Sequence, residues 1–315
     1  MTVRWGFIGA GYVASRAMAP AVHATPGAQL YAVASRDAQR SAELEPTVVH
    51  ESYRELLEDS NVDAVYISLT NVQHKEWVLA ALDAGKHVLC EKPLALNAAE
   101  VREMMTAAVR NQRMLVEAVW TRWQPRMSRM AEIVQRGDLG ELQKISSAFT
   151  FQSDLTGNYR SDPNMGGGAL LDVGCYQAHL WLTLLGEAVD CNIENVETTL
   201  GTTGIDLTTL VRARLDGHIV ADSLSSFDLP AEQRIEVVGS QTTMRTGVGE
   251  AFTLWKQEAT LLVGDTVETF APDDAFALMV EDVGAAIQSH DSTVFPSESS
   301  LRVAEILDDI CSLAH

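Results

Sequence analysis

Residues 3–14 read Val-Arg-Trp-Gly-Phe-Ile-Gly-Ala-Gly-Tyr-Val-Ala, and this stretch decides the fold that we expect for the chain. Residues 3–8 are typical of a buried strand, and an alanine-rich helix follows the glycines. The first glycine permits a tight turn, the second lets backbone N–H groups approach a pyrophosphate, and the small alanine lets helix and strand pack closely. Because the motif lies between a strand and a helix, it predicts a dinucleotide site rather than an ordinary glycine turn, with contacts from Gly9, Gly11, Tyr12 and Val13.

Strands continue to alternate with helices as far as residue 118. Further strands are expected at 28–34, 64–69, 87–91 and 114–118, and helices at 52–58, 73–84 and 97–111. This alternation predicts a parallel sheet that is covered on both faces.

From about residue 141 the pattern changes to long alternating runs, at 143–152, 208–215, 218–227, 234–238 and 242–246. Such runs are typical of an open, mostly antiparallel sheet. Helices are expected near 170–185, 275–289 and 297–314. We therefore predict an α/β protein of two domains: a Rossmann domain with a parallel, doubly wound sheet over residues 1–122, and an α/β domain with an open, mostly antiparallel sheet over residues 123–315.

The composition excludes several classes of partner. The 315 residues carry a net charge of −20, so nucleic acid would be repelled. The four cysteines are scattered, which indicates neither a metal site nor a disulfide framework. Neither a signal peptide nor a membrane-spanning apolar run is present, which predicts a cytoplasmic protein with a small-molecule partner. The acidic surface is consistent with either a salt-rich cytoplasm or GC-rich codons.

The end of the second strand predicts which dinucleotide is bound. An acidic residue there would accept from the ribose 2′-hydroxyl of NAD, whereas a cation accommodates the 2′-phosphate of NADP. Ser35 and Arg36 occupy this place, so NADP is favoured over NAD. Two alternatives stay open: Arg36 only begins a solvated helix, or Asp37 accepts from a ribose hydroxyl.

Two further strand ends carry polar residues at the same expected edge of the sheet. Thr70, Asn71 and His74 are predicted to contact the ribose or nicotinamide; alternatively Asn71 caps the next helix and His74 is solvated. Glu91 and Lys92 end another strand, before a proline that can fix the exit of the chain through a cis bond. Both are expected near the cofactor, with Lys92 facing the substrate, and the alternative is a surface Lys92–Glu91 pair.

The helix expected at 170–185 carries Asp172, Tyr176 and His179 at a spacing that predicts one shared face. Gly166–Gly168 precede it and leave a bare backbone suited to close approach by a ligand. The alternatives are a carboxylate favoured by the helix dipole, a core tyrosine and an ordinary helical histidine.

Together these motifs resemble the glucose-fructose oxidoreductase and inositol dehydrogenase (Gfo/Idh/MocA) family. The resemblance is carried by residues 9–14, Ser35-Arg36, Asn71-x-x-His74, residues 84–93 (Ala-Gly-Lys-His-Val-Leu-Cys-Glu-Lys-Pro) and residues 166–176 (Gly-Gly-Gly-Ala-Leu-Leu-Asp-Val-Gly-Cys-Tyr). Asp172-x-x-x-Tyr176 and residues 116–125 are similar to the branch of dihydrodiol dehydrogenases and NADP-dependent D-xylose dehydrogenases. Thr70-Asn71 departs from the Pro-Asn of many members.

The resemblance implies hydride transfer between a nicotinamide and a carbinol carbon of a sugar, polyol or cyclic diol. Tyr176 would be the general acid or base, Lys92 would lower its pKa, and Asp172 would bind a substrate hydroxyl or hold Lys92. Weaker candidates for the substrate pocket are Trp120, Trp123, Asn158, Tyr159, Arg160 and His179. The resemblance also implies a homodimer or homotetramer formed through the second sheet. Two other functions stay open: an NAD-dependent glycosidase and a non-catalytic NADP-binding regulator.

Overall fold

The computed structural model describes residues 2–247, 249, 251–289 and 297–314. The chain divides into two compact units. The first comprises Met1–Trp120 and Asp274–Leu301, and the second comprises Thr121–Asp273 and Arg302–His315.

The first unit contains a parallel six-stranded sheet in the order β3-β2-β1-β4-β5-β6. Its strands are β1 (Val3–Ile8), β2 (Ala28–Ala34), β3 (Val48–His50), β4 (Ala64–Ile67), β5 (His87–Glu91) and β6 (Leu115–Ala118). The predicted parallel sheet is confirmed, although the three-residue β3 was not predicted. The strand order reverses between β1 and β4, and ligands of such sheets bind outside the carboxyl ends of the strands at that point.

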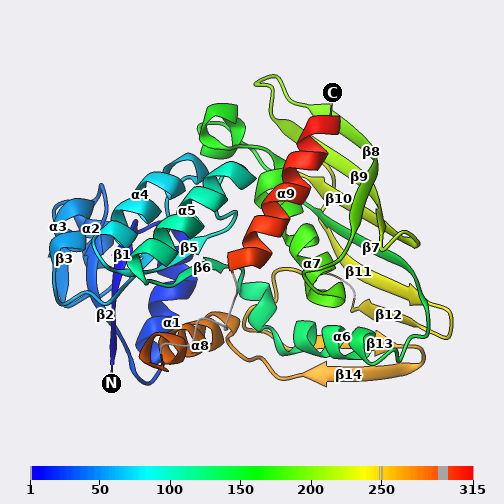
Figure 1. The fold of residues 1–315 in the computed structure, drawn as a ribbon, viewed down its shortest axis with the longest axis horizontal. Coiled ribbons are helices and arrows are strands. Elements are labelled where there is room, and N and C mark those ends of the chain that lie inside the picture. Colours follow the sequence, from blue (N-terminus) through cyan, green and yellow to red (C-terminus); the bar gives the residue numbers. More distant parts are fainter. Residues whose placement is uncertain (1, 248, 250, 290–296, 315) are drawn as a thin grey trace. The chain divides into compact units, whose positions relative to one another are not determined.

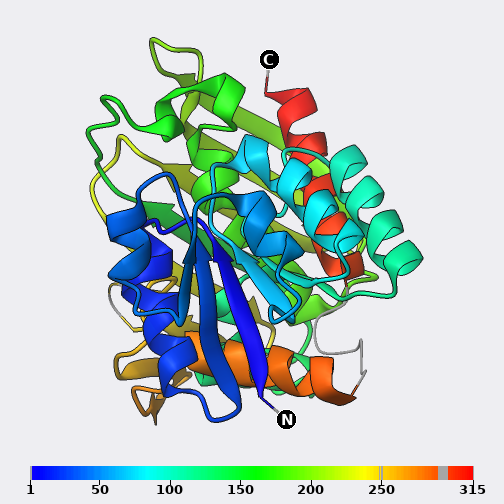
Figure 2. The same ribbon diagram turned by 90° about the vertical axis from the view of Figure 1, so that its left-hand side faces the viewer.

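Helices cover both faces of this sheet (Figures 1 and 2). The helices α4 (Asn71–Asp83) and α5 (Ala98–Asn111) pack together, and α1 (Ala19–Ala24) packs against α8 (Ala275–Ser289). The shorter α2 (Ala38–Ala42) and α3 (Tyr53–Glu58) complete the unit, and α1 continues from a π-helical turn, η1 (Ala14–Met18). We expected residues 275–289 in the second domain, but α8 buries Phe276, Met279 and Val283 in the first unit. An apolar helix face does not indicate which unit will cover it.

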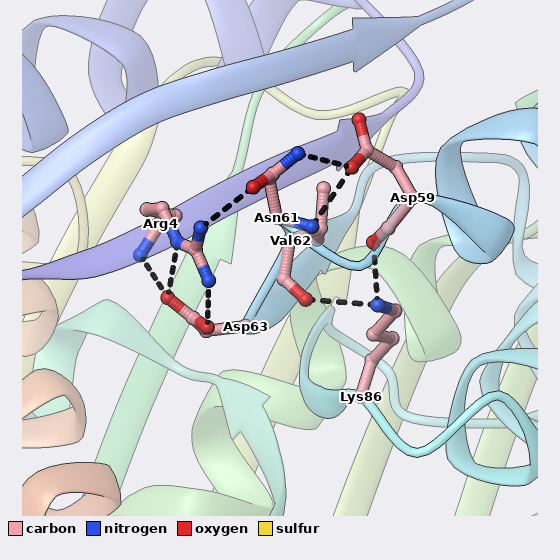
Figure 3. A network of polar contacts seen from close by, with 6 residues as sticks. All are labelled: Arg4, Asp59, Asn61, Val62, Asp63 and Lys86. Carbon is pink, nitrogen blue, oxygen red and sulfur yellow. Dashed lines mark hydrogen bonds and ion pairs between the residues drawn. The ribbon is translucent and has the colours of Figure 1, made fainter.

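The amino ends of β1, β4 and β5 are held by a polar network (Figure 3). The Arg4 guanidinium donates to both carboxylate oxygens of Asp63, at 2.9 and 3.0 Å, and to Asn61. Lys86 precedes β5 and is 6% exposed; its Nζ donates to the carbonyl oxygens of Asp59, at 2.7 Å, and Val62, at 2.9 Å. Side chains thus supply hydrogen-bond partners to the loop that precedes β4.

The second unit contains an eight-stranded sheet in the order β14-β13-β12-β11-β7-β10-β9-β8. Its strands are β7 (Leu142–Thr150), β8 (Cys191–Leu200), β9 (Asp206–Leu215), β10 (Ile219–Ser226), β11 (Glu232–Gly239), β12 (Thr243–Thr246), β13 (Ala259–Val263) and β14 (Thr266–Phe270). Every neighbouring pair is antiparallel except β7 and β10. The predicted open, mostly antiparallel sheet is confirmed. The two edge strands, β8 and β14, and β13 next to β14 are partly exposed and were not predicted.

Helices pack on one face of this sheet, and charged residues line the other. The helices are α6 (Pro125–Gln135), which was not predicted, α7 (Cys175–Leu185) and α9 (Ser297–Leu313), which belongs to this unit from Arg302 onward. On the open face, Asp222 accepts from Arg212 at 2.7 Å and pairs with Lys144 at 2.9 Å, and Arg214 pairs with Glu194. Among the described helices, none is long and apolar enough to cross a membrane.

Candidate active site

Different constraints favour glycine at the two glycine positions of the first turn. Gly9 has φ +100°, and a Cβ there would lie 2.3 Å from the Ser68 carbonyl oxygen, so packing inside the protein requires glycine. At Gly11 a Cβ would lie 3.7 Å from Ser68 Oγ, an ordinary contact, so no neighbouring protein group requires the bare backbone. Gly11 therefore leaves space for a group from outside, which fits a dinucleotide pyrophosphate at the start of a helix. Tyr12, beside it, is 77% exposed.

The loop after β2 presents Arg36 to solvent and keeps its neighbours occupied. Ser35 Oγ donates to the Asp37 carbonyl oxygen at 2.6 Å and accepts from Ser41. Asp37 caps α2 by accepting from the backbone N–H groups of Gln39 and Arg40. Arg36 precedes this cap, so it does not begin the helix, and the Asp37 carboxylate is already engaged. Arg36 is the exposed cation of this strand end.

The loop after β4 is tied to the loop after β5 by a buried histidine. Thr70, not Asn71, is the N-cap residue of α4, and Asn71 is 4% exposed. His74 is fully buried: its Nδ1 lies 2.9 Å from the Pro93 carbonyl oxygen and its Nε2 3.2 Å from that of Leu69. Burial lowers the pKa of His74. The solvated histidine considered above does not fit; in this structure His74 holds two loops together and presents no surface to a ligand.

At the end of β5, Glu91 is buried and Lys92 is partly exposed. Glu91 is 8% exposed and accepts from the Tyr66 hydroxyl at 2.6 Å, so it is not the surface carboxylate of the alternative considered above. Burial raises the pKa of Glu91, while the Tyr66 hydroxyl and the Lys92 charge oppose this rise. The Lys92–Pro93 bond is cis, as the proline suggested, and Lys92 itself is partly exposed.

In the second unit, Gly167 and Gly168 meet protein rather than open space. A Cβ at Gly167 would lie 2.4 Å from the Arg160 carbonyl oxygen, and one at Gly168, where φ is +111°, would lie 1.9 Å from Asp206 Oδ1. Asp206 also accepts from the Leu170 backbone N–H at 2.7 Å and from Thr209. Burial raises the pKa of Asp206 to about 6. We predicted a bare backbone for a ligand, but close packing within the chain accounts for these two glycines.

Asp172 pairs with Arg160, a partner that the sequence analysis did not assign to it. Arg160 donates through Nε at 2.8 Å and Nη2 at 3.2 Å, and Asp172 is 6% exposed. Asn158 accepts from the Arg160 backbone N–H, and the Arg160 guanidinium lies 5.0 Å from the centre of the Tyr159 ring. Three of the weaker pocket candidates thus gather around the Asp172 carboxylate.

Tyr176 lies on α7, which continues from a π-helical turn, η5 (Leu170–Gly174), that also carries Asp172. Its ring is 5.8 Å from that of Phe149 and 6.2 Å from that of Phe252, and the residue is 8% exposed. The charge of Tyr176 also acts on Arg160. His179 is 1% exposed, which favours a packing role over the predicted substrate contact.

The predicted tryptophans divide between the units. Trp120 belongs to the first, where it is 6% exposed and stacks on Phe276 with ring centroids 5.5 Å apart. Trp123 belongs to the second. Lys92 and Tyr176 likewise belong to different units, so their joint action remains a proposal.

Known proteins match both halves of the chain. Residues 3–119 match the oxidoreductase family with an NAD-binding Rossmann fold, and residues 127–245 match the GFO/IDH/MocA C-terminal domain. The NADP-dependent D-xylose 1-dehydrogenase 2 of Haloferax volcanii is 32% identical over 97% of this chain and 95% of its own. The trans-1,2-dihydrobenzene-1,2-diol dehydrogenase of Mus musculus is 33% identical over 85% of this chain and 80% of its own.

Solved structures extend the likeness to a reductase. KijD10, a 3-ketoreductase from Actinomadura kijaniata solved with NADP and TDP-benzene, has a TM-score of 0.91 and 27% identity, covering 100% of this chain and 98% of its own. Variants of KijD10 with a lysine changed to alanine and with a tyrosine changed to phenylalanine also match. The protein is thus an oxidoreductase with a dinucleotide-binding Rossmann domain. It belongs to the Gfo/Idh/MocA family, as the motifs predicted.

Two residues that shape the site were not singled out from the sequence. Tyr66 reads as one more apolar residue of a buried strand, and only its place on the strand beside β5 links it to Glu91. Asp206 follows a turn far along the chain, and no local pattern places its carboxylate against Gly168. Both act through pairings between distant segments, which spacing within a single element does not report.

Proposed function

We propose that this protein is an NADP-dependent dehydrogenase that moves a hydride between the nicotinamide and a carbinol carbon of a polyhydroxylated substrate. The observation that carries the proposal is the bare, unfilled backbone at Gly11, at the carboxyl edge that also presents Arg36 and Lys92. The NADP-dependent relatives that match over most of the chain support it. The bound nicotinamide supplies or accepts the hydride.

The chain's own residues bind the cofactor and move the proton. Arg36 pairs with the 2′-phosphate, and Tyr176 gives or takes the proton of the carbinol oxygen. An ordinary tyrosine, with a pKa of about 10, is a weak base at neutral pH, and a nearby cation favours its phenolate. Lys92 supplies that cation in our proposal. Arg160, whose charge interacts with that of Tyr176, adds to it, while Asp172 offsets part of the Arg160 charge.

The substrate that we propose is a neutral sugar, polyol or cyclic diol. The Arg160 guanidinium is paired at two nitrogens with Asp172, so the pair has no net charge to attract an anion. Hydroxyl groups can instead exchange hydrogen bonds with the edges of that pair and with Asn158, against aromatic walls.

The experiment is a substrate panel assayed with the purified full chain and its Tyr176→Phe variant. Aldoses, 1,5-anhydro sugars, trans-dihydrodiols and dicarbonyls are each offered with NADP and with NAD, and the change in reduced nicotinamide is followed by absorbance. We expect turnover of a neutral polyhydroxylated compound with NADP. Tyr176→Phe should lower kcat by roughly 10² to 10⁴ while NADP binding survives. A matched control is Tyr31→Phe, which removes a hydroxyl from β2 and should keep full turnover.

Three results would overturn the proposal. Normal turnover in Tyr176→Phe would make Tyr176 a core aromatic residue. Cleavage of aryl glycosides by protein that retains NAD through dialysis, without net reduction, would favour the glycosidase alternative. NADP binding with no turnover of any compound on the panel would favour a regulator.

A further inference from the structure

Tyr66 is a buried tyrosine at the centre of the six-stranded sheet, and the proposed function gives it no role. It has no exposed surface, and its ring packs edge-on against Phe7 with centroids 4.9 Å apart. A phenylalanine would fill this space equally well, yet the hydroxyl donates to Glu91 Oε1 at 2.6 Å. The polar end of the side chain therefore has a task of its own.

The length of this bond lies in the range of a hydroxyl that donates to a carboxylate. Hydrogen bonds from a hydroxyl to a carboxylate have lengths of about 2.5 to 2.7 Å. Four groups act on the Glu91 carboxyl besides its burial: Tyr66 from β4, Glu117 from β6, Lys92 at the end of its own strand and the Lys92 backbone N–H. Burial and Glu117 raise the pKa of Glu91, whereas Tyr66 and Lys92 lower it. The Tyr66 hydroxyl thus favours the carboxylate against the cost of burying it.

The strand that carries Tyr66 also borders the glycine turn. Ser68, two residues after Tyr66, donates its backbone N–H to the Ile8 carbonyl oxygen at 2.9 Å. Its own carbonyl oxygen is 2.3 Å from where a Gly9 Cβ would be, and its Oγ is 3.7 Å from the corresponding place at Gly11. Tyr66 therefore lies on the strand between the turn expected to hold the dinucleotide and the strand end that carries Lys92.

We propose that Tyr66 is a positioning residue for Lys92: its hydroxyl holds the Glu91 carboxylate at the end of β5, where Lys92 follows it in the chain. The inference rests on the proposed function, because the part that Lys92 takes in proton transfer is itself proposed. A carboxylate beside an ammonium favours the charged lysine and offsets part of its electric field. Tyr66 then governs how much of the Lys92 charge is offset at the end of β5.

The test measures the titration of Lys92 directly, without relying on catalysis. The sequence contains five lysines, so the full chain labelled with ¹³C at the lysine ε carbon gives few NMR signals, and Lys92→Met identifies the one from Lys92. In Tyr66→Phe we expect Lys92 to titrate at lower pH by roughly half a unit to one unit, because the Glu91 carboxylate is no longer held in place near the lysine. Tyr31→Phe is the control and should leave the Lys92 titration in place.

A second variant separates the proposed path from a general disturbance of the core. Glu91→Gln removes the carboxylate itself, so it should shift the Lys92 titration in the same direction as Tyr66→Phe. The double variant should shift it no further than Glu91→Gln alone, since Tyr66 acts through Glu91. Additive shifts in the double variant, or an unchanged Lys92 titration in Tyr66→Phe, would overturn the inference.

The pH dependence of oxidation distinguishes failure of this inference from failure of the proposed function. With the Glu91 carboxylate no longer held in place, less of the Lys92 charge is offset, so the acid limb of kcat/KM in Tyr66→Phe should move to lower pH. A shifted Lys92 titration in a protein that oxidises nothing would leave the positioning role intact and refute the dehydrogenase. An active dehydrogenase whose Lys92 titration is unaffected by Tyr66→Phe would support the proposed function and refute the positioning role of Tyr66.

Discussion

In the six-stranded sheet, the amino ends and the carboxyl ends of the strands both carry a lysine, but the two lysines have different roles. Lys86 precedes β5, is buried, and donates to two backbone carbonyl oxygens (Figure 3). Lys92 follows β5, is partly exposed, and lies at the edge that also holds Gly11 and Arg36. Both lysines belong to one short motif. The end of β5 at which each lies, rather than the motif, therefore decides whether the lysine stabilises the fold or lies at the proposed site. The comparison leads to four predictions.

Lys92→Met should have the largest effect on catalysis. We expect kcat to fall by roughly 10² to 10⁴, because in the proposed mechanism Lys92 is the cation that favours the Tyr176 phenolate. The pH at which oxidation sets in should increase. The thermal midpoint of unfolding should stay within a few degrees of the native value. Steady-state kinetics measure kcat, and a thermal melt measures the midpoint of unfolding. A clear loss of stability with normal kcat would show that Lys92 stabilises the fold and does not act in catalysis.

Lys86→Met should do the opposite. Two carbonyl oxygens lose a charged donor, so the free energy of unfolding should fall by about 2 to 4 kcal/mol. Among molecules that remain folded, kcat should be close to native. Urea denaturation together with active-site titration measures the two quantities. A variant that stays as stable as the native chain would show that these hydrogen bonds contribute little.

Arg36→Ala should weaken NADP binding selectively. Losing a charge-assisted pair with the 2′-phosphate costs on the order of 1.5 to 3 kcal/mol, or roughly ten- to a hundred-fold in affinity. NAD has no such phosphate, so its affinity should change little. Fluorescence titration with both nucleotides checks this, and an equal loss for NAD and NADP would show that Arg36 stacks on the adenine or supports the loop.

Arg4→Met should have the smallest effect, although Arg4 lies at the same edge as Lys86. The Arg4 and Asp63 side chains are each about a third exposed, with both at 34%, so solvent screens their pair. We expect a loss of roughly 1 kcal/mol or less, reduced further by salt. Urea denaturation at low and high salt measures it. A loss as large as that of Lys86→Met would mean that solvent exposure does not determine how much each of the two cations contributes to stability.

The sequence predicted most accurately what local patterns determine. Residues 3–14 predict a strand, a turn and a helix, and the structure confirms the parallel sheet that was predicted from this alternation. The placement of α8 depends on surfaces from distant segments, and the Arg160–Asp172 pair depends on how the chain turns between these two residues, so neither follows from the pattern of a single element. Gly167 and Gly168 illustrate the limit best, because a glycine required by internal packing reads the same as one required by a ligand.

For protein engineering, Gly168 and Asp206 depend on each other and should be treated as one unit. The Asp206 carboxylate occupies the place of the missing side chain and accepts from the backbone just beyond it. A graft that moved residues 166–176 to another scaffold without Asp206 would leave a hole beside Gly168 and an N–H without its acceptor. Any transplant of the helical segment that carries Asp172 and Tyr176 should therefore include the first residues of β9.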